Sequence, residues 1–521
     1  VAPGAPTDAQ VMASAPGTFY YIARRGPDLM DPRARADQQL NGIIIVDAST
    51  AVVDSAERVF GISWSTAIDT ASPTGISLST MTINGLSWPH TERLSYQQGD
   101  SVRWRVVNFT DIDHPMHLHG FYFRLDSKGD GVTDSLFDGD EQRTEVTEVL
   151  NPFQTMSLAW RADRPGNWIF HCHYAAHISS LVSLDDEHGR LDTAMLMHHM
   201  SDRPHQMFGL VMGVSVSPRG AVARAPSNPR DIRLVLREKS NVYGAHSGYS
   251  FVVGGTPGEL NAAAMPVPGA PLILERGKPV AITVVNQADD NAAVHWHGIE
   301  LQSYSDGVPG WSGWMTNVMQ PIKPHDSLTV RFTPPRAGTF MYHSHFNETQ
   351  QMGGGAYGPI VVLEPGQRFD PETDKLLFFG AAGITTNVVF GPYAPFTMNG
   401  KTQPEAMNLR AGTRYRFRLL NLAGDEPLVV ALNQSPQPAS KPVEWRAVAK
   451  DGYPIPPARA TLRPATLTFD PGEIYDFEYT PTVPGELALV FGPRPPPPGS
   501  PPLPPGFSPP APTITVPVHV R

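Results

Sequence analysis

The chain has 521 residues, which is too long for one hydrophobic core and predicts three or four domains. Its formal net charge is −10 and it contains no long run of Lys or Arg, which argues against nucleic acid and anionic membranes as partners. No apolar stretch is long enough to span a bilayer, and a single cysteine excludes a disulfide within the chain.

The first segment with strand character resembles the end of a domain. Residues 15–47 (APGTFYYIARRGPDLMDPRARADQQLNGIIIVD) contain a Pro-Gly turn, an apolar strand and a second apolar strand. The same turn-and-strand pattern closes each later unit, but here no opening strands precede it. We therefore expect residues 1–50 to be the C-terminal part of a domain whose opening strands would lie before Val1.

The rest of the chain repeats one unit three times. Its first half pairs two strands across a Gly turn and ends in Asn, at 83–108, 272–286 and 398–421. Its second half is a Gly turn followed by a strand, at 164–173, 336–345 and 483–492. The alternating strands, the frequent turns and the lack of a long 3.6-residue period predict an all-β protein of tandem β-sandwiches with few helices.

Pro-rich segments mark the predicted boundaries. Residues 217–229 and 363–374 are expected linkers, whereas the polyproline stretch 493–512 precedes a final strand and is an expected surface loop. Together with the repeats, these linkers predict four units, which are residues 1–50, 51–217, 218–366 and 367–521.

Histidines recur in pairs of the form H-x-H. Random placement of the 18 histidines would give about 0.6 such pairs, yet the chain has four. The pairs are His117/His119, His171/His173, His295/His297 and His343/His345. Because side chains at i and i+2 of a strand share a face, each pair presents two imidazoles in one direction. Eight imidazoles, divided equally between two repeats, predict a cluster of about three metal ions where the two units meet.

The only cysteine, Cys172, lies between His171 and His173 and must therefore face the opposite side of the strand. His114 and His177 are available on that side, which completes a His₂Cys set of the kind found in blue-copper electron-transfer sites. Such sites often have a weak axial thioether, for which Met207, which opens the expected last strand of this unit (207–216), is the first candidate. Leu210, which would leave the metal with three ligands, is the second.

The motifs HPMHLHG, HCHYAAH, HWHG and YHSH together resemble the four copper motifs of the multicopper oxidases. The resemblance implies cupredoxin-like Greek-key sandwiches and four copper ions, one of type 1, one of type 2 and two of type 3. It also implies one-electron oxidation of a small-molecule reductant coupled to the four-electron reduction of O₂ to water. By analogy, the protein would be periplasmic or secreted, either as a monomer or as a homo-oligomer.

The resemblance also assigns roles residue by residue. It implies that type 1 copper is held by His114, Cys172 and His177, with Met207 as the candidate axial ligand. Type 2 copper would be held by His117 and His295, and the type 3 pair by His119, His171, His173, His297, His343 and His345. Asp306 matches an aspartate used for proton delivery to oxygen, although an ordinary Asp-Gly turn is the alternative, and Glu348 is a weaker candidate. The units 1–50 and 367–521 would be free of copper.

Two features depart from the family pattern. The type 1 unit precedes the HWHG/HSH unit, whereas most three-domain members have the reverse order, so the cluster could form within one chain or between subunits. Ile178 stands where members often carry an acid, and a loop rich in Met and His (195–207) follows. That loop is either a copper-docking site or, as we favour, a cover over the type 1 edge.

The leading functional hypothesis is a laccase-like oxidase of phenols and aromatic amines. A metal oxidase acting on cuprous, ferrous or manganous ions is the alternative within the same family. A copper-binding electron carrier without O₂ turnover is the alternative of another class.

Overall fold

The computed structural model describes residues 8, 10, 12, 15–23, 40–48, 56–68, 77–178, 207–220, 228–254, 265–383, 394–437, 440–496 and 510–521. Helical structure in these residues is limited to α2 (Ala175–Ile178), α4 (Glu348–Gly353) and the 3-10 turns η1 (Gly139–Glu141) and η2 (Ser303–Ser305). None of these helices is long and apolar enough to cross a membrane. The prediction of an all-β protein with few, short helices is confirmed.

The strands form three two-sheet sandwiches in chain order. The first contains β3 (Arg58–Ile68), β4 (Ser77–Ile83), β5 (Arg93–Gln97), β6 (Ser101–Asn108), β7 (His114–Leu118), β8 (Phe123–Gly129), β9 (Asp134–Leu136), β10 (Arg143–Glu145), β11 (Thr147–Leu150), β12 (Thr155–Arg161), β13 (Gly166–Cys172) and β14 (Val211–Ser217). The second contains β15 (Arg230–Tyr243), β16 (His246–Val253), β17 (Leu272–Glu275), β18 (Val280–Gln287), β19 (Val294–His297), β20 (Gly313–Trp314), β21 (Asn317–Val318), β22 (Ser327–Phe332), β23 (Gly338–Ser344) and β24 (Tyr357–Leu363).

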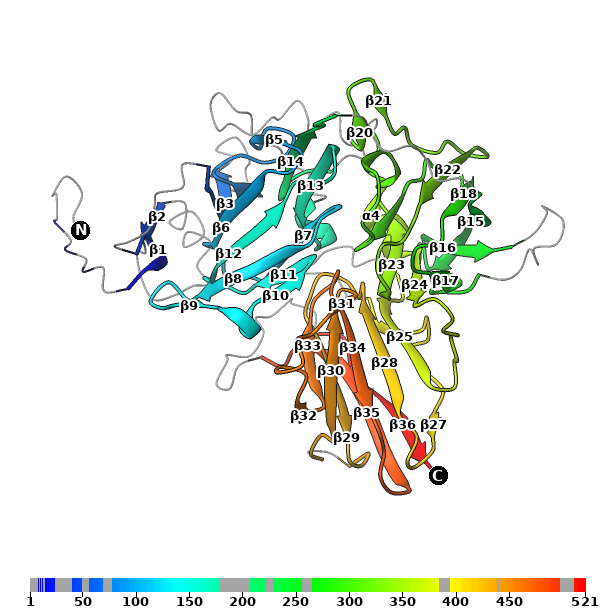
Figure 1. Ribbon diagram of the computed structural model, residues 1–521. Coiled ribbons are helices and arrows are strands. Elements are labelled where there is room, and N and C mark those ends of the chain that lie inside the picture. The colour runs from blue at the N-terminus through cyan, green and yellow to red at the C-terminus, as the bar shows by residue number, and fades with distance from the viewer. Residues whose placement is uncertain are drawn as a thin grey trace.

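The third sandwich contains β25 (Asp374–Ala381), β26 (Phe396–Met398), β27 (Met407–Leu409), β28 (Tyr415–Asn421), β29 (Leu428–Asn433), β30 (Glu444–Lys450), β31 (Tyr453–Pro454), β32 (Leu462–Pro464), β33 (Thr466–Phe469), β34 (Ile474–Tyr479), β35 (Gly485–Pro493) and β36 (Ile514–Val520). Figure 1 shows this yellow-to-red sandwich below the other two, so that the ends of β30 and β34 lie against both of them.

Strand order is similar in the three sandwiches. In the first, the sheet β11-β7-β13-β14-β5 faces the sheet β10-β8-β12-β6-β3-β4. In the second, β17-β24-β23-β19 faces β16-β15-β18-β22. The short strand β20 of the second sandwich also pairs with β13 of the first, at Gly313 and Asn167, so a backbone ladder crosses between the two.

Burial explains why these segments form strands. Along β6 the buried residues Val102, Trp104 and Val106 alternate with more exposed neighbours, as expected for a strand with one face in a core. Every residue of β23 is buried, and β13 is nearly as enclosed. One face of each strand packs against the core of its own sandwich, and the opposite face packs against a neighbouring sandwich.

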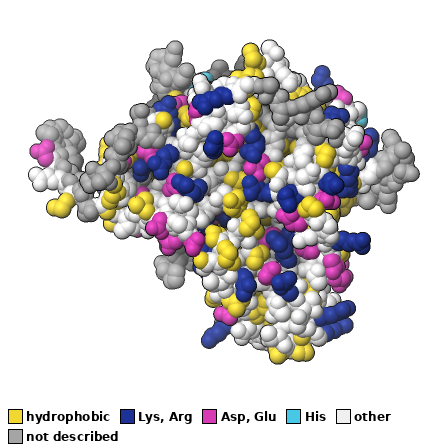
Figure 2. Space-filling model, viewed as in Figure 1, with side chains coloured by type: hydrophobic (Ala, Val, Ile, Leu, Met, Phe, Trp, Pro, Cys, Tyr) yellow, Lys and Arg dark blue, Asp and Glu magenta, His cyan; other side chains and the backbone are white. Residues whose placement is uncertain are grey.

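The N-terminal strands β1 (Gly17–Ile22) and β2 (Asn41–Val46) pair antiparallel and pack on the outer edge of the first sandwich. The Thr18 amide donates to Asp134 Oδ2 at 2.8 Å, and the Tyr20 hydroxyl donates to the Phe153 carbonyl at 2.7 Å. Figure 1 shows this pair at the far left, beside β9. On the face drawn in Figure 2, basic and acidic side chains are interspersed and no large patch of one sign is visible.

A buried ionic cluster joins the first and third sandwiches. The ammonium of Lys450 pairs with Glu148 at 2.7 Å and Glu473 at 2.8 Å, and it also contacts Glu145. Lys128 and Arg143 of the first sandwich pair with the same Glu148 at 2.5 and 2.9 Å. Three acidic side chains and three basic ones therefore form one connected cluster across this junction.

We expect Lys450→Met to lower the free energy of unfolding by about 3–5 kcal/mol, because it leaves buried carboxylates without their shared cation. The matched control is Lys401→Met, which removes an exposed i,i+4 partner of Glu405 and should cost at most about 1 kcal/mol. Urea denaturation of both variants measures the difference. Equal stability of the two variants would contradict the role given to Lys450.

Candidate metal centre

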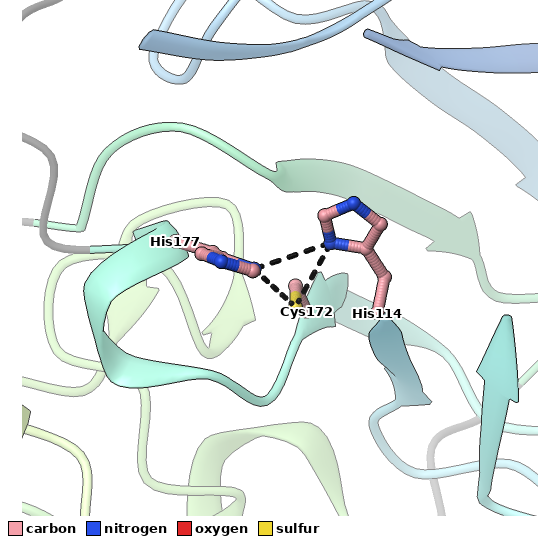
Figure 3. A group of neighbouring side chains, drawn as sticks. All are labelled: His114, Cys172 and His177. Carbon is pink, nitrogen blue, oxygen red and sulfur yellow. Dashed lines mark hydrogen bonds between the residues drawn. The ribbon is translucent and has the colours of Figure 1, made fainter. Parts of the chain in front are cut away.

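Cys172, His114 and His177 meet at one end of the first sandwich (Figure 3). The Cys172 sulfur lies 3.3 Å from His177 Nδ1 and 3.7 Å from His114 Nδ1, and the two Nδ1 atoms are 3.2 Å apart. Cys172 ends β13, His114 opens β7, and His177 lies on the short helix α2. One sulfur and two imidazole nitrogens thus converge on a single point.

The surroundings orient these side chains for metal binding. The Thr110 hydroxyl lies 2.8 Å from His114 Nε2, which leaves Nδ1 as the nitrogen that faces the thiol. Burial lowers the pKa of His177 to about 3, so its ring is neutral at physiological pH. Burial also raises the pKa of the Cys172 thiol, so a bound cation would be needed to favour the thiolate.

Residues 207–210 return to this site before the last strand of the sandwich. The predicted strand opening at Met207 is wrong, because β14 begins only at Val211. Gly209 has a φ of 66°, and the Leu210 backbone accepts from the Cys172 amide at 3.0 Å and donates to the His177 carbonyl at 3.1 Å. Met207 is half-buried against the core. Whether Met207 supplies a fourth ligand or Leu210 leaves the metal with three stays a prediction. Residues 195–206 of the Met/His loop lie outside the described residues.

The eight paired histidines form a second cluster between the first and second sandwiches, and all of them are buried. Within this cluster, ligand nitrogens lie within 4.8 Å of one another in three groups, which are His117/His119/His295, His119/His171/His345 and His173/His297/His343. His119 belongs to two of these groups, and His117 and His295 face each other with their Nε2 atoms 3.4 Å apart. Counting His119 with His171 and His345 gives the division into two and six that the family resemblance implies, with all eight rings from a single chain.

On several rings, the nitrogen that points away from the centre of the cluster forms a hydrogen bond with the protein. His117, His171 and His343 each donate from Nδ1 to a backbone carbonyl, at 2.8 to 2.9 Å. His295 does the same toward the carbonyl of Asp306 at 2.7 Å. His297 is reversed, because its Nε2 lies 3.3 Å from Thr147 Oγ1 and its Nδ1 faces inward. These bonds fix which nitrogen each ring presents to the centre of the cluster.

The inner atoms fit a bound metal. Among the described residues, Nε2 of His343, Nε2 of His345 and both ring nitrogens of His173 are buried without a hydrogen-bond partner. Such atoms cost free energy unless something satisfies them. Burial lowers the pKa values of most of these rings, and these are His117, His119, His171, His173, His297 and His343. Neutral imidazole is the form that binds copper, zinc or iron.

Two carboxylates adjoin the cluster. Asp306 is buried, with Oδ2 2.8 Å from His119 Nδ1 and Oδ1 3.4 Å from His295 Nδ1. The alternative interpretation of an Asp-Gly turn also holds, because Gly307 has a φ of 101° and packs on the backbone of Val294. Glu348 lies 3.0 Å from His345 Nδ1. Burial opposes a charge on His345, but this carboxylate outweighs that effect and raises its pKa.

Sequence reasoning missed the hydroxyls that contact the rings. Thr110 and Thr147 touch His114, His117 and His297, yet neither stands in a metal-binding motif. It also did not anticipate that the third sandwich reaches both sites. Asp425 Oδ1 accepts from the Ala176 amide at 3.2 Å, beside His177, and Asp470 pairs with the hydroxyl of Tyr174.

Comparison with known proteins places both histidine-bearing segments in one family. Multicopper oxidase family models match residues 64–184 and 250–367, which contain all eight paired histidines together with His114, Cys172 and His177. The chain belongs to the multicopper oxidase family. Its sandwiches are of the cupredoxin-like kind.

Individual relatives match this multicopper oxidase over short segments. Multicopper oxidase MCE of Talaromyces pinophilus is 42% identical over 97 residues, or 18% of this chain and 15% of that protein. Laccase-1 of Emericella nidulans is 39% identical over 107 residues, or 20% of this chain and 17% of that protein. The solved structure of a blue copper oxidase from Nitrosomonas europaea aligns with a TM-score of 0.41 and 22% identity, over 56% of this chain and 86% of that one.

We expect Cys172→Ser to abolish the intense blue absorption and to lower the copper content by about one ion per chain. A hydroxyl of similar size cannot supply the thiolate on which the colour of a blue-copper site depends. Visible absorption with metal quantitation on parent and variant measures both effects. A variant that kept the parent's colour and copper content would contradict a ligand role for Cys172.

Proposed function

We propose that this multicopper oxidase is laccase-like, oxidising phenols or aromatic amines by single electrons and reducing O₂ to water. The observation that supports this most is the alternation along β13. Cys172 lies with His114 and His177, whereas its two neighbours in the chain, His171 and His173, lie in two separate imidazole triads. A few covalent bonds therefore connect a site suited to electron entry with a site suited to a multi-electron reaction.

Copper ions would supply one-electron transfer at the first site and dioxygen reduction at the second. In this proposal His114, Cys172 and His177 would hold type 1 copper, with Met207 as the candidate fourth ligand and Leu210 as the alternative that leaves three. His117 and His295 hold type 2 copper. The type 3 pair is held by one triad each, His119/His171/His345 and His173/His297/His343. Four ions per chain follow from these groupings.

Exposure distinguishes the two sites. His177 is half-buried, whereas His114, Cys172 and all eight cluster histidines are buried. An organic reductant would therefore approach at His177. Asp425 lies beside this residue through its bond to the Ala176 amide, and it can accept the proton that a phenol loses with its electron. The name of the Emericella relative, a laccase, supports the same substrate class.

The imidazole cluster is suited to a small substrate. A cavity of about 50 Å³ reaches His173 and is lined also by Glu348, Asp425 and Pro471, which is room for a molecule of the size of dioxygen or water. Asp306 and Glu348 hold His119 and His345 in position. The same two carboxylates are candidates for delivering the protons that reduction of O₂ consumes.

The proposal extends to the domain organisation and the location of the protein. Residues 51–217 and 218–366 would be the copper-binding units and residues 1–50 and 367–521 the copper-free ones, in a monomer or homo-oligomer outside the cytoplasm. Oxidation of cuprous, ferrous or manganous ions is the second candidate, because His177 is accessible to any reductant. A carrier without turnover would need only the first site, and the eight buried imidazoles speak against it.

Copper quantitation combined with oxygen uptake tests the proposal. Fully loaded protein should contain about four coppers per chain and consume O₂ in the presence of a phenol. About one copper per chain without O₂ uptake would support the carrier. Uptake with metal ions but not with phenols or aromatic amines would support the metal oxidase.

We expect Asp425→Asn to lower kcat/KM for a phenol by about tenfold or more while leaving that for ferrocyanide unchanged. Asn retains an oxygen for the Ala176 amide but cannot take a proton, and ferrocyanide has none to give. Because burial raises the pKa of Asp425, its carboxylate form grows as pH rises, so the ratio of phenol to ferrocyanide kcat/KM should rise with pH in the parent only. Equal losses for both reductants would indicate a structural role.

A further inference from the structure

The third sandwich, which carries no paired histidines, supports the cluster through one buried carboxylate. Asp451 lies in the turn between β30 and β31 and is fully buried. Its Oδ2 accepts from the amides of Val146 and Thr147, both at 3.1 Å, and its Oδ1 accepts from the amide of Ile474 at 3.0 Å. One side chain thus binds three backbone amides that belong to two different sandwiches.

The two residues bound by Asp451 support an imidazole directly. The Val146 carbonyl accepts from His117 Nδ1 at 2.8 Å. The Thr147 hydroxyl lies 3.0 Å from the same nitrogen and 3.3 Å from His297 Nε2. The rings of His117 and His297 stack with centroids 3.9 Å apart. Any shift of the 146–147 backbone therefore moves both partners of His117 Nδ1 and one partner of His297.

The contact requires a carboxylate. Three amides point at two oxygens, so an Asn side chain must turn its NH₂ group toward at least one N–H, whichever way the amide lies. The backbone conformation does not favour Asp over Asn at this position. Asp451 has a φ of 49°, and both residue types tolerate this left-handed region better than most others. Replacing Asp451 by Asn therefore changes the acceptor while preserving size and turn preference.

A second contact shows how closely the third sandwich approaches the ligands. Gly472 has a φ of 93°, and a Cβ there would lie 2.6 Å from Cδ2 of His173. Asp451 and Gly472 flank the start of β34 in space, because the Asp451 amide donates to the Ile474 carbonyl at 2.8 Å. The end of the third sandwich is therefore packed on the cluster and not merely near it.

We propose that Asp451 is a positioning residue for the copper site formed by His117 and His295, acting through Val146 and Thr147. This inference rests on the proposed function, in which those two histidines hold type 2 copper. That site is the most sensitive of the three in the cluster. In that proposal it has two histidine ligands, so a misplaced His117 removes half of them, whereas His297 shares its triad with two other rings.

The test uses copper-loaded parent protein and the Asp451→Asn variant, dialysed against a graded series of a copper chelator. We expect 10–100-fold weaker retention of one copper per chain, as is typical when a residue that orients a metal ligand is lost. The electron paramagnetic resonance signal of type 2 copper should fall with it, while the blue absorption of the Cys172 site persists.

The matched control is Asp476→Asn. Asp476 is also a buried carboxylate of the third sandwich, but it accepts from Thr339 at 2.9 Å and pairs with Arg418 at 3.2 Å, away from His117. This variant should retain the type 2 signal even if its stability falls. If Asp451→Asn does not fold, Asp451→Glu, which keeps both acceptor oxygens but is longer by one methylene, should show the same selective loss.

Two results would overturn the inference. One is an Asp451 variant that keeps all four coppers at every chelator concentration at which the parent does. The other is loss of the blue absorption together with the type 2 signal in both Asp451→Asn and Asp451→Glu, which would indicate a general structural role. A parent protein that binds fewer than four coppers would instead overturn the proposed function, and this inference with it.

Discussion

Side chains on adjacent positions of a strand point to opposite faces, and β13 uses this constraint to serve two sites at once. Cys172 lies on one face with His114 and His177, and His171 and His173 lie on the other in separate imidazole triads. Neither site could move along the strand without the other. A shift of one residue would exchange the thiol and the imidazoles between the two faces. The pairing of β13 with β7, which aligns His171 with His117, fixes this register.

Burial gives the cluster its chemical character, and it requires all three sandwiches. The first and second sandwiches contribute four imidazoles each, and the third closes the same region through Asp451 and Gly472. Enclosure keeps most of the rings neutral and leaves several nitrogens without a partner, which favours metal binding. The ionic cluster around Lys450 lies at the same junction, so the ion pairs that join the first and third sandwiches also help to position the ligands.

Much of this arrangement could be predicted from local patterns. The alternation of apolar and polar residues predicted the all-β class. The H-x-H spacing on strands predicted that the two imidazoles of each pair lie on the same face of their strand. The side of β13 on which Cys172 lies followed from the same alternation. Thr147 and Asp451 could not be predicted, because their roles depend on which backbone amides meet across an interface of segments some 300 residues apart. The start of β14 was misplaced because Gly209 and Leu210 turn toward His177, a tertiary contact without a local signal.

Anomalous diffraction at the copper edge from crystals of the copper-loaded protein would locate the bound ions. We expect four peaks per chain. One peak lies among His114, Cys172 and His177, and three lie within the eight-histidine cluster, at the two triads and between His117 and His295. A single peak at Cys172, or peaks in the cluster formed only by histidines of two different chains, would contradict this expectation.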